Sequence, residues 1–217
     1  MFMKYLFLIF SLFLFSCNAP VQDTNENNET QTTQKEVILA LWDSLTAWYG
    51  LEESESYPSK LQKKLDDAGY NYEVINAWVS WDTSANILSR ASLYLEKNPS
   101  IVILVVWWND GLRSLSTVDL QQNILKIIDT FPDAQIVLGW MDIPVNLWIS
   151  YRNDFKKVYA DIAKEREDIY FMEFFLEWVW GKKEYNISDM IHPNSQWYDI
   201  IVANLVQFLE KNNVIIK

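Results

Sequence analysis

The sequence predicts an α/β fold: a three-layer α/β/α sandwich with a central five-stranded parallel sheet. Apolar runs of strand length alternate with helical patterns along the chain, the most apolar run lies near the middle, and there is no internal repeat. Strictly alternating strands and helices form parallel βαβ units with right-handed crossovers. A parallel sheet is covered by helices on both faces, so its central strand is expected to be apolar throughout. The length of 217 residues favours one domain.

Each element is predicted from its own pattern. The first strand is EVILAL, residues 36–41, an apolar run of strand length. The helix expected over 56–68 carries Leu61 and Leu65 one turn apart, and Gly69 suits its end. The other strands are expected at YEVINA (72–77), IVILVV (101–106), QIVLG (135–139) and DIYFME (168–173), and the other helices over 84–97, 118–130, 151–166 and 195–211.

The first 34 residues are predicted to lie outside this domain, which spans 35–217. Within residues 1–17, Lys4 precedes a short apolar stretch that has the form of a secretory signal peptide. Its end, Leu-Phe-Ser-Cys17, resembles the bacterial lipobox, in which the cysteine is acylated. The alternative is an ordinary signal peptide with an incidental cysteine. Residues 18–34 are almost entirely polar and predict a flexible tether. We therefore expect an exported, lipid-anchored protein of the cell envelope.

Charge and cysteine content limit the partners and the covalent links that this chain can have. The net charge of −11 and the sequence pI near 4.5 argue against a nucleic-acid partner, because such partners usually require a basic face. Cys17 is the only cysteine, so no disulfide can form within the chain. The sequence leaves the oligomeric state open.

Candidate site residues follow the ends of the predicted strands. Ser44 comes just after the first strand, and Trp81 and Asn109 follow the second and third strands. Ligands of such sheets bind outside the carboxyl ends of the strands, so these residues are expected on one edge. Asp189 and His192 precede the last helix, and His192 is the only histidine. A serine hydrolase needs a hydroxyl, an imidazole and a carboxylate, and only His192 can supply the imidazole.

Four short blocks occur in a specific order. They are Trp-Asp-Ser-Leu at 42–45, Ser-Trp-Asp-Thr at 80–83, Trp-Trp-Asn-Asp at 107–110 and Asp-Met-Ile-His at 189–192. Together with NDGLR (109–113) and IHPN (191–194), they resemble the SGNH hydrolases, also called the GDSL esterase/lipase family. The resemblance covers about residues 36–209 and is strongest to the exported arylesterase, thioesterase I and lysophospholipase branch. It implies the flavodoxin-like SGNH fold.

The resemblance also implies a role for each site residue. Ser44 is the expected nucleophile, His192 the general base and acid, and Asp189 the carboxylate that orients the imidazole. The expected oxyanion hole consists of the backbone N–H groups of Ser44 and Trp81 and the side-chain amide of Asn109. The family implies no metal and no cofactor. Expected substrates are small-molecule esters, acyl thioesters and lipids such as lysophospholipids.

Two further functions remain open from the sequence. The second candidate function is the removal of acetyl groups from cell-envelope or plant polysaccharides, which related hydrolases carry out. A third possibility is a non-catalytic glycan-binding lipoprotein that uses exposed indoles. Three acidic residues next to the motif residues, Asp43, Asp82 and Asp110, are interpreted as turn or capping residues rather than acid catalysts.

Tryptophan stands where the family has glycine. Trp42 and Trp107 occupy the first positions of their blocks, and Trp81 occupies the position at which the family supplies an oxyanion-hole glycine. Trp108 follows Trp107 in the third block, and Trp48, Trp78, Trp140 and Trp197 lie in contexts that resemble turns or strand ends. The chain has 11 tryptophans and 5 glycines. At average usage it would hold about 15 glycines, close to both types taken together.

We interpret this pattern as recoding. Under this hypothesis the gene comes from a bacterium that reads UGA as glycine, whereas the printed chain was translated with UGA read as tryptophan. Positions that need a positive φ or a close backbone approach favour glycine, which supports the hypothesis on steric grounds. The competing interpretation is that the indoles are real and form a glycan-stacking surface on a degenerate hydrolase.

Overall fold

The computed structural model of the chain describes residues 34–42, 52–106, 108–140, 149–173 and 194–217. All of them belong to one compact unit, residues 34–217. The predicted signal peptide, Cys17 and most of the predicted tether lie outside the described residues. In the described part of the chain, no helix is both long and apolar enough to cross a membrane.

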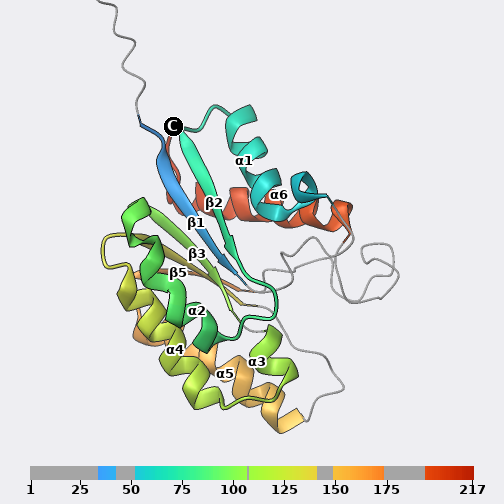
Figure 1. Cartoon of the computed structure of the whole chain (residues 1–217), viewed down its shortest axis with the longest axis vertical. Helices are drawn as coiled ribbons and strands as arrows, with labels where there is room; N and C mark the ends of the chain where they lie inside the picture. Colours follow the sequence, from blue (N-terminus) through green and yellow to red (C-terminus); the bar gives the residue numbers. More distant parts are fainter. Residues whose placement is uncertain (1–33, 43–51, 107, 141–148, 174–193) are drawn as a thin grey trace, which may run out of the picture. The chain divides into compact units, whose positions relative to one another are not determined.

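The centre of this unit is a five-stranded sheet in which every neighbouring pair is parallel, in the order β2-β1-β3-β4-β5 (Figure 1). The order reverses direction after β2, as in doubly wound folds. The strands are β1 (Glu36–Trp42), β2 (Tyr72–Trp78), β3 (Ile101–Val105), β4 (Gln135–Gly139) and β5 (Ile169–Met172). All five predicted strands are confirmed to within one residue at each end.

Helices cover both faces of the sheet, which confirms the predicted three-layer sandwich. Figure 1 shows α1 and α6 on one face and α2, α4 and α5 on the other. The α-helices are α1 (Tyr57–Asp67), α2 (Ser84–Ala91), α3 (Trp108–Leu112), α4 (Thr117–Thr130), α5 (Ile149–Glu165) and α6 (Ser195–Lys211), and the 3-10 helices are η2 (Glu53–Glu55) and η3 (Ser92–Lys97).

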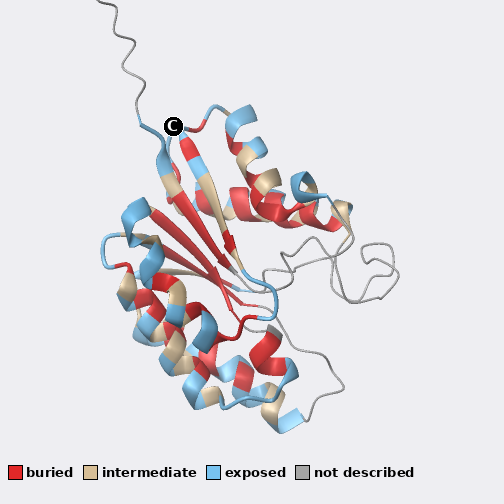
Figure 2. Cartoon of the chain, in the orientation of Figure 1, coloured by how far each residue is buried: buried red, intermediate tan, exposed pale blue. Residues whose placement is uncertain are grey.

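The core lies on both sides of the central strands. Every residue of β3 is buried, as its unbroken apolar sequence predicted. Figure 2 shows the buried colour along the middle strands and on the helix faces turned toward them. Tyr159 of α5 is also buried, and its hydroxyl donates to the carbonyl of Val106 just beyond β3. The end of β3 is therefore held by a helix of the covering layer.

The strands end together at one edge of the sheet, here called the carboxyl rim. In the register of the sheet, Trp42 at the end of β1 pairs with Trp78 of β2 and with Val105 of β3. At the other side, Gly139 of β4 pairs with Met172 of β5. The segments that leave β1, β2 and β3 therefore start side by side, as the sequence predicted.

Two local differences from the predicted elements occur. The helix predicted over 84–97 is α2 followed by the 3-10 helix η3, which ends at Asn98 in the left-handed conformation (φ 47°). Asparagine tolerates that conformation, and Pro99 disfavours continued helix at the residue before it. The short helix α3 was not predicted, because five residues are too few for a periodic pattern.

Candidate active site

The described residues contain one part of the predicted site. Trp81 lies in the loop between β2 and α2, residues 79–83, and Asn109 lies on α3 directly after β3. Ser44, Asp189 and His192 lie outside the described residues, so their predicted roles remain predictions.

Residue 81 has the backbone conformation of a glycine. Trp81 has a φ of 67°, in the left-handed region, and it is the one described tryptophan with a positive φ. That region is disfavoured for residues with a Cβ, by about 1–2 kcal/mol. The indole is 64% exposed, so its packing gives little compensation for that strain. Glycine would adopt this backbone conformation without that cost.

Asn109 is buried against the same loop. Its side chain is 1% exposed, and its Nδ2 donates to the backbone carbonyl of Asp82 at 2.9 Å. This bond fixes the amide plane. An amide carries two N–H donors, so the second can serve another acceptor. The two described members of the predicted oxyanion hole, the backbone of residue 81 and the amide of Asn109, thus belong to segments in direct contact.

The carboxylate of Asp82 is occupied by an ion pair. Arg90 of α2 donates from Nε to Asp82 Oδ2 at 2.7 Å, and its Nη1 donates to the carbonyl of Ala77 at 2.7 Å. Both side chains of the pair are largely buried. Asp82 is thus a loop-fixing residue, which agrees with its interpretation as a turn residue. Arg90 was not predicted as part of this region, because its partners lie 8 and 13 residues away along the chain.

The amino end of α6 points toward the carboxyl rim. Near the other end of α6, Glu210 accepts a hydrogen bond from Tyr70, which lies just before β2. Beyond the helix, Val214 accepts one from Gln135, the first residue of β4. Because these partners mark the amino edge of the sheet, α6 runs antiparallel to the strands. Its first turn, capped by the side chain of Asn194, therefore begins on the side of the rim.

The other tryptophans occupy varied environments. Trp78 ends β2, and the buried Trp140 directly follows β4, so both lie at strand ends as predicted. Trp197 lies in the first turn of α6, inside the helix predicted over 195–211, and is 1% exposed. Its buried indole N–H has no acceptor among the described residues.

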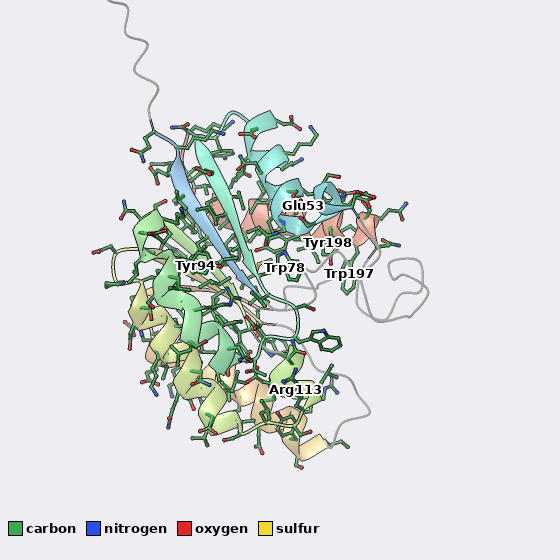
Figure 3. The ribbon with its side chains drawn as sticks, in the orientation of Figure 1. Glu53, Trp78, Tyr94, Arg113, Trp197 and Tyr198 are labelled. Carbon is green, nitrogen blue, oxygen red and sulfur yellow. The ribbon has the colours of Figure 1, made fainter. Side chains whose placement is uncertain are left out.

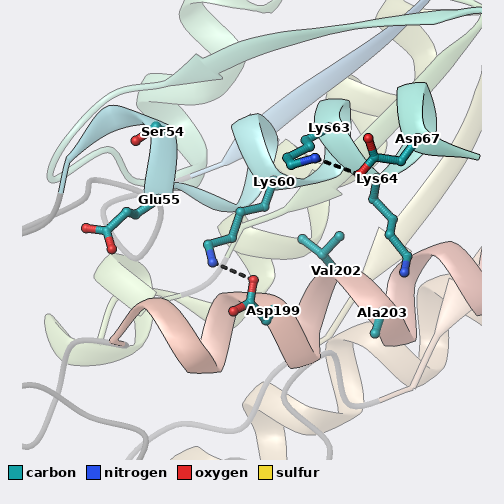
Figure 4. Close-up of a pocket in the computed structure, with 9 residues that line it drawn as sticks. All are labelled: Ser54, Glu55, Lys60, Lys63, Lys64, Asp67, Asp199, Val202 and Ala203. Carbon is teal, nitrogen blue, oxygen red and sulfur yellow. Dashed lines mark hydrogen bonds and ion pairs between the residues drawn. The ribbon is translucent and has the colours of Figure 1, made fainter.

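A hollow lies between α1 and α6, with part of its lining from η2. It has a volume of about 390 Å³ and is open to solvent (Figure 4). Lys60 and Lys63 line it, and each is paired with a carboxylate, Asp199 and Asp67 respectively. The described residues that line it include no histidine, and neither Trp81 nor Asn109 is among them. No group of three or more metal-binding side chains occurs within the described ranges.

Comparisons with known proteins identify the family of this chain. The profile of the GDSL-like lipase/acylhydrolase family matches residues 40–200. Esterase TesA of Pseudomonas aeruginosa is 36% identical over 167 residues, which are 76% of this chain and 83% of the relative. The arylesterase of Vibrio mimicus is 31% identical over 207 residues, 94% of this chain and 98% of the relative.

A solved structure is similar over the same region. The psychrotrophic esterase EstA from Pseudoalteromonas sp., in a structure inhibited by monoethylphosphonate, matches with a TM-score of 0.76 and 28% identity. The match covers 82% of this chain and 98% of that chain. With the family profile, the relatives and the parallel five-stranded sheet in agreement, this chain belongs to the GDSL-like lipase/acylhydrolase family, the SGNH hydrolases.

Proposed function

We propose that this protein is a serine esterase that hydrolyses carboxylic ester or thioester bonds through an acyl-serine intermediate. The observation that carries the proposal is the contact between Asn109 and the loop containing residue 81 at the carboxyl rim. Such a pair of donors can stabilise the oxyanion of a tetrahedral intermediate. The relatives named esterase and arylesterase favour this activity over polysaccharide deacetylation and over glycan binding without catalysis.

The proposed reaction has two halves. The hydroxyl of Ser44 attacks the carbonyl carbon, its proton passes to His192, and Asp189 keeps the imidazole oriented. The oxyanion is held by the N–H groups of residues 44 and 81 and the amide of Asn109. Collapse of this intermediate breaks the bond to the leaving alcohol or thiol, which takes the proton from His192. Water then attacks the acyl-serine in the same manner and releases the acid.

Two described boundaries support this assignment. Ser44 is two residues beyond Trp42, the last residue of β1, which lies between β2 and β3 in the sheet. His192 is two residues before Asn194, the cap of α6 on the side of the rim. Both residues are therefore close in sequence to chain positions at the same edge as Asn109.

An ester panel of graded chain length tests the proposed activity on the enzyme in which glycine is restored at the tryptophan positions that UGA encodes. We expect turnover of p-nitrophenyl esters and of the matching acyl thioesters, with no turnover by Ser44→Ala. A control replacement, Ser54→Ala on the exposed helix η2, is expected to retain full activity. Turnover that persists in Ser44→Ala would contradict the acyl-serine mechanism.

We also propose that residue 81 is glycine in the protein that its own host makes. The left-handed φ at this position, together with the shortage of glycine in the chain, supports recoding of UGA. The test is to read the codons and to sequence peptides of the protein from its host. UGA codons and glycine at 81 are expected, whereas UGG at most of the eleven tryptophan positions would rule recoding out.

For its location we propose export and lipid anchoring through Cys17. The support is the apolar leader, the Ser-Cys end and the polar residues 18–34. Expression in a bacterial host should give a product that partitions with membranes, and Cys17→Ser should release it or block its processing. A wild-type product that is cleaved and recovered entirely in the aqueous fraction would support the ordinary signal peptide instead.

A further inference from the structure

We propose that Asp110 is a positioning residue that holds the two oxyanion-hole segments, the loop carrying residue 81 and the turn carrying Asn109, at their working separation. This inference rests on the proposed function, because it assigns a task within the same site. It assigns Asp110 no proton transfer and no contact with substrate.

The carboxylate of Asp110 accepts hydrogen bonds from the first residue of α2. Ser84, the first residue of that helix, donates its backbone N–H to Asp110 Oδ2 and its hydroxyl to Oδ1, both at 2.7 Å. Asn123 of α4 in turn donates to the Ser84 hydroxyl at 3.0 Å. Hydrogen bonds to an ionised group are shorter and stronger than neutral ones. Both oxygens of the carboxylate therefore bind one residue of another element.

The position of the Asp110–Ser84 hydrogen bonds is the reason for the proposed positioning role. Ser84 directly follows the loop of residues 79–83, and Asp110 directly follows Asn109 on α3. The carboxylate thus joins the segment that presents the N–H of residue 81 to the segment that presents the Asn109 amide. The two joined residues are 26 positions apart in the sequence, so no local interaction replaces this link.

Two further bonds act in the same direction. Arg113, labelled in Figure 3, directly follows α3 and donates from Nη2 to the carbonyl of residue 81 at 3.1 Å. That bond goes to the backbone, so it holds whichever side chain stands at 81. From α5, the hydroxyl of Tyr151 lies 2.8 Å from the carbonyl oxygen of Leu115 and 3.2 Å from that of Asp110, and its single O–H is shared between these two acceptors. The short helix α3 is thereby fixed from both sides.

The burial of Asp110 favours a positioning role over a role as an acid catalyst. Asp110 is 3% exposed and Ser84 is 1% exposed. Burial raises the pKa of Asp110, and the hydrogen bonds from Ser84 oppose that shift. A buried carboxylate is costly unless its oxygens are hydrogen-bonded, and here each oxygen has a donor from Ser84. The carboxylate is thus committed to a structural link rather than open to a substrate proton.

Three variants test the inference. Asp110→Ala removes both bonds, Ser84→Ala removes one and retains the charge, and Asp110→Asn can retain both. In the last case the amide oxygen accepts from the Ser84 N–H, while the amide nitrogen donates to the Ser84 hydroxyl. The control is Gly69→Ala, a backbone-strained position (φ 77°) where an added Cβ meets no atom within 4 Å. Gly69 lies just before β2, at the edge opposite the rim.

The expected results follow from geometry. A displacement of about 1 Å can cost about 10²-fold in rate. We therefore expect Asp110→Ala to lower kcat about 10- to 100-fold with KM nearly unchanged, and Ser84→Ala to lower it less. Asp110→Asn should recover most of kcat. Phosphonylation of the enzyme by a fluorophosphonate should slow in parallel, and hydrogen exchange at residues 79–84 should quicken. Gly69→Ala should lower Tm without changing kcat.

Each contrary result has a distinct meaning. If the parent enzyme, with glycine restored at the recoded positions, hydrolyses no ester, the proposed function fails and this inference fails with it. If the parent is active and Asp110→Ala retains its kcat, the positioning role alone is wrong. Asp110→Asn as slow as Asp110→Ala would show that the charge acts rather than the position, and would also overturn the inference. If Asp110→Ala does not fold, Ser84→Ala decides: unchanged kcat and unchanged exchange would overturn it.

Discussion

The backbone at residue 81 predicts that glycine is more stabilising there than alanine. Trp81→Gly and Trp81→Ala both remove the indole, which is 64% exposed, so the two variants lack the same side-chain packing. The two differ in whether a Cβ stands at a φ of 67°. Comparing them therefore isolates the backbone strain from the removal of the indole.

The magnitude follows from two opposing effects. A Cβ in the left-handed region costs about 1–2 kcal/mol. Glycine has the greater conformational freedom when unfolded, which favours alanine by about 0.5–1 kcal/mol. The difference spans about 0–1.5 kcal/mol, and its middle value leaves Trp81→Gly more stable by about 0.75 kcal/mol. At most positions the glycine variant is the less stable of the two. A more stable Trp81→Gly would therefore itself indicate backbone strain at residue 81.

Urea unfolding measures the difference as a change in midpoint at constant m-value. The matched control is Gln122, an exposed position within α4, where alanine should exceed glycine by about 0.8–1 kcal/mol. If Trp81→Ala is as stable as Trp81→Gly, residue 81 does not require glycine and the steric support for recoding is lost.

Three further predictions concern the triad and the scaffold. Ser44→Ala and His192→Ala should each abolish ester turnover to a similar extent because they act as a unit, whereas Asp189→Asn should cost less; steady-state kinetics on one ester compares them. Gly69→Ala should destabilise the fold by about 0.75 kcal/mol, because the strain at its φ of 77° exceeds the entropic advantage of alanine, and this is seen as a lower Tm in thermal unfolding. Burial, with a smaller effect of a nearby carboxylate, raises the pKa of Tyr151 from 10.0 to about 12. Its contribution to stability should therefore be complete below pH 10 and lost as the pH rises through about 12, and spectrophotometric titration of Tyr151→Phe should lack one phenolate that forms near pH 12.

The layered fold could be predicted because its determinants are local. The unbroken apolar run at 101–106 marks a strand covered on both faces, and β3 is buried throughout. Gly69 was expected to end a helix, and it has a positive φ just beyond α1. Alternation of strands and helices then leaves few topologies with right-handed crossovers, and the carboxyl rim follows from that topology.

The interactions that fix the site could not be predicted in the same way. The partners of Arg113 and Asp110 lie 32 and 26 residues away, and their pairing depends on how α3 packs against the β2–α2 loop. The short helix α3 itself has no periodic signal. Tertiary packing, which no local pattern encodes, decided each of these features.

Identifying the residue that a fluorophosphonate modifies tests the account most directly. Peptide mass spectrometry of the labelled, active enzyme should place the adduct on Ser44, and Ser44→Ala should take up no label. An adduct on another serine, or an active enzyme that remains unmodified, would contradict the proposal that Ser44 is the nucleophile at the carboxyl rim.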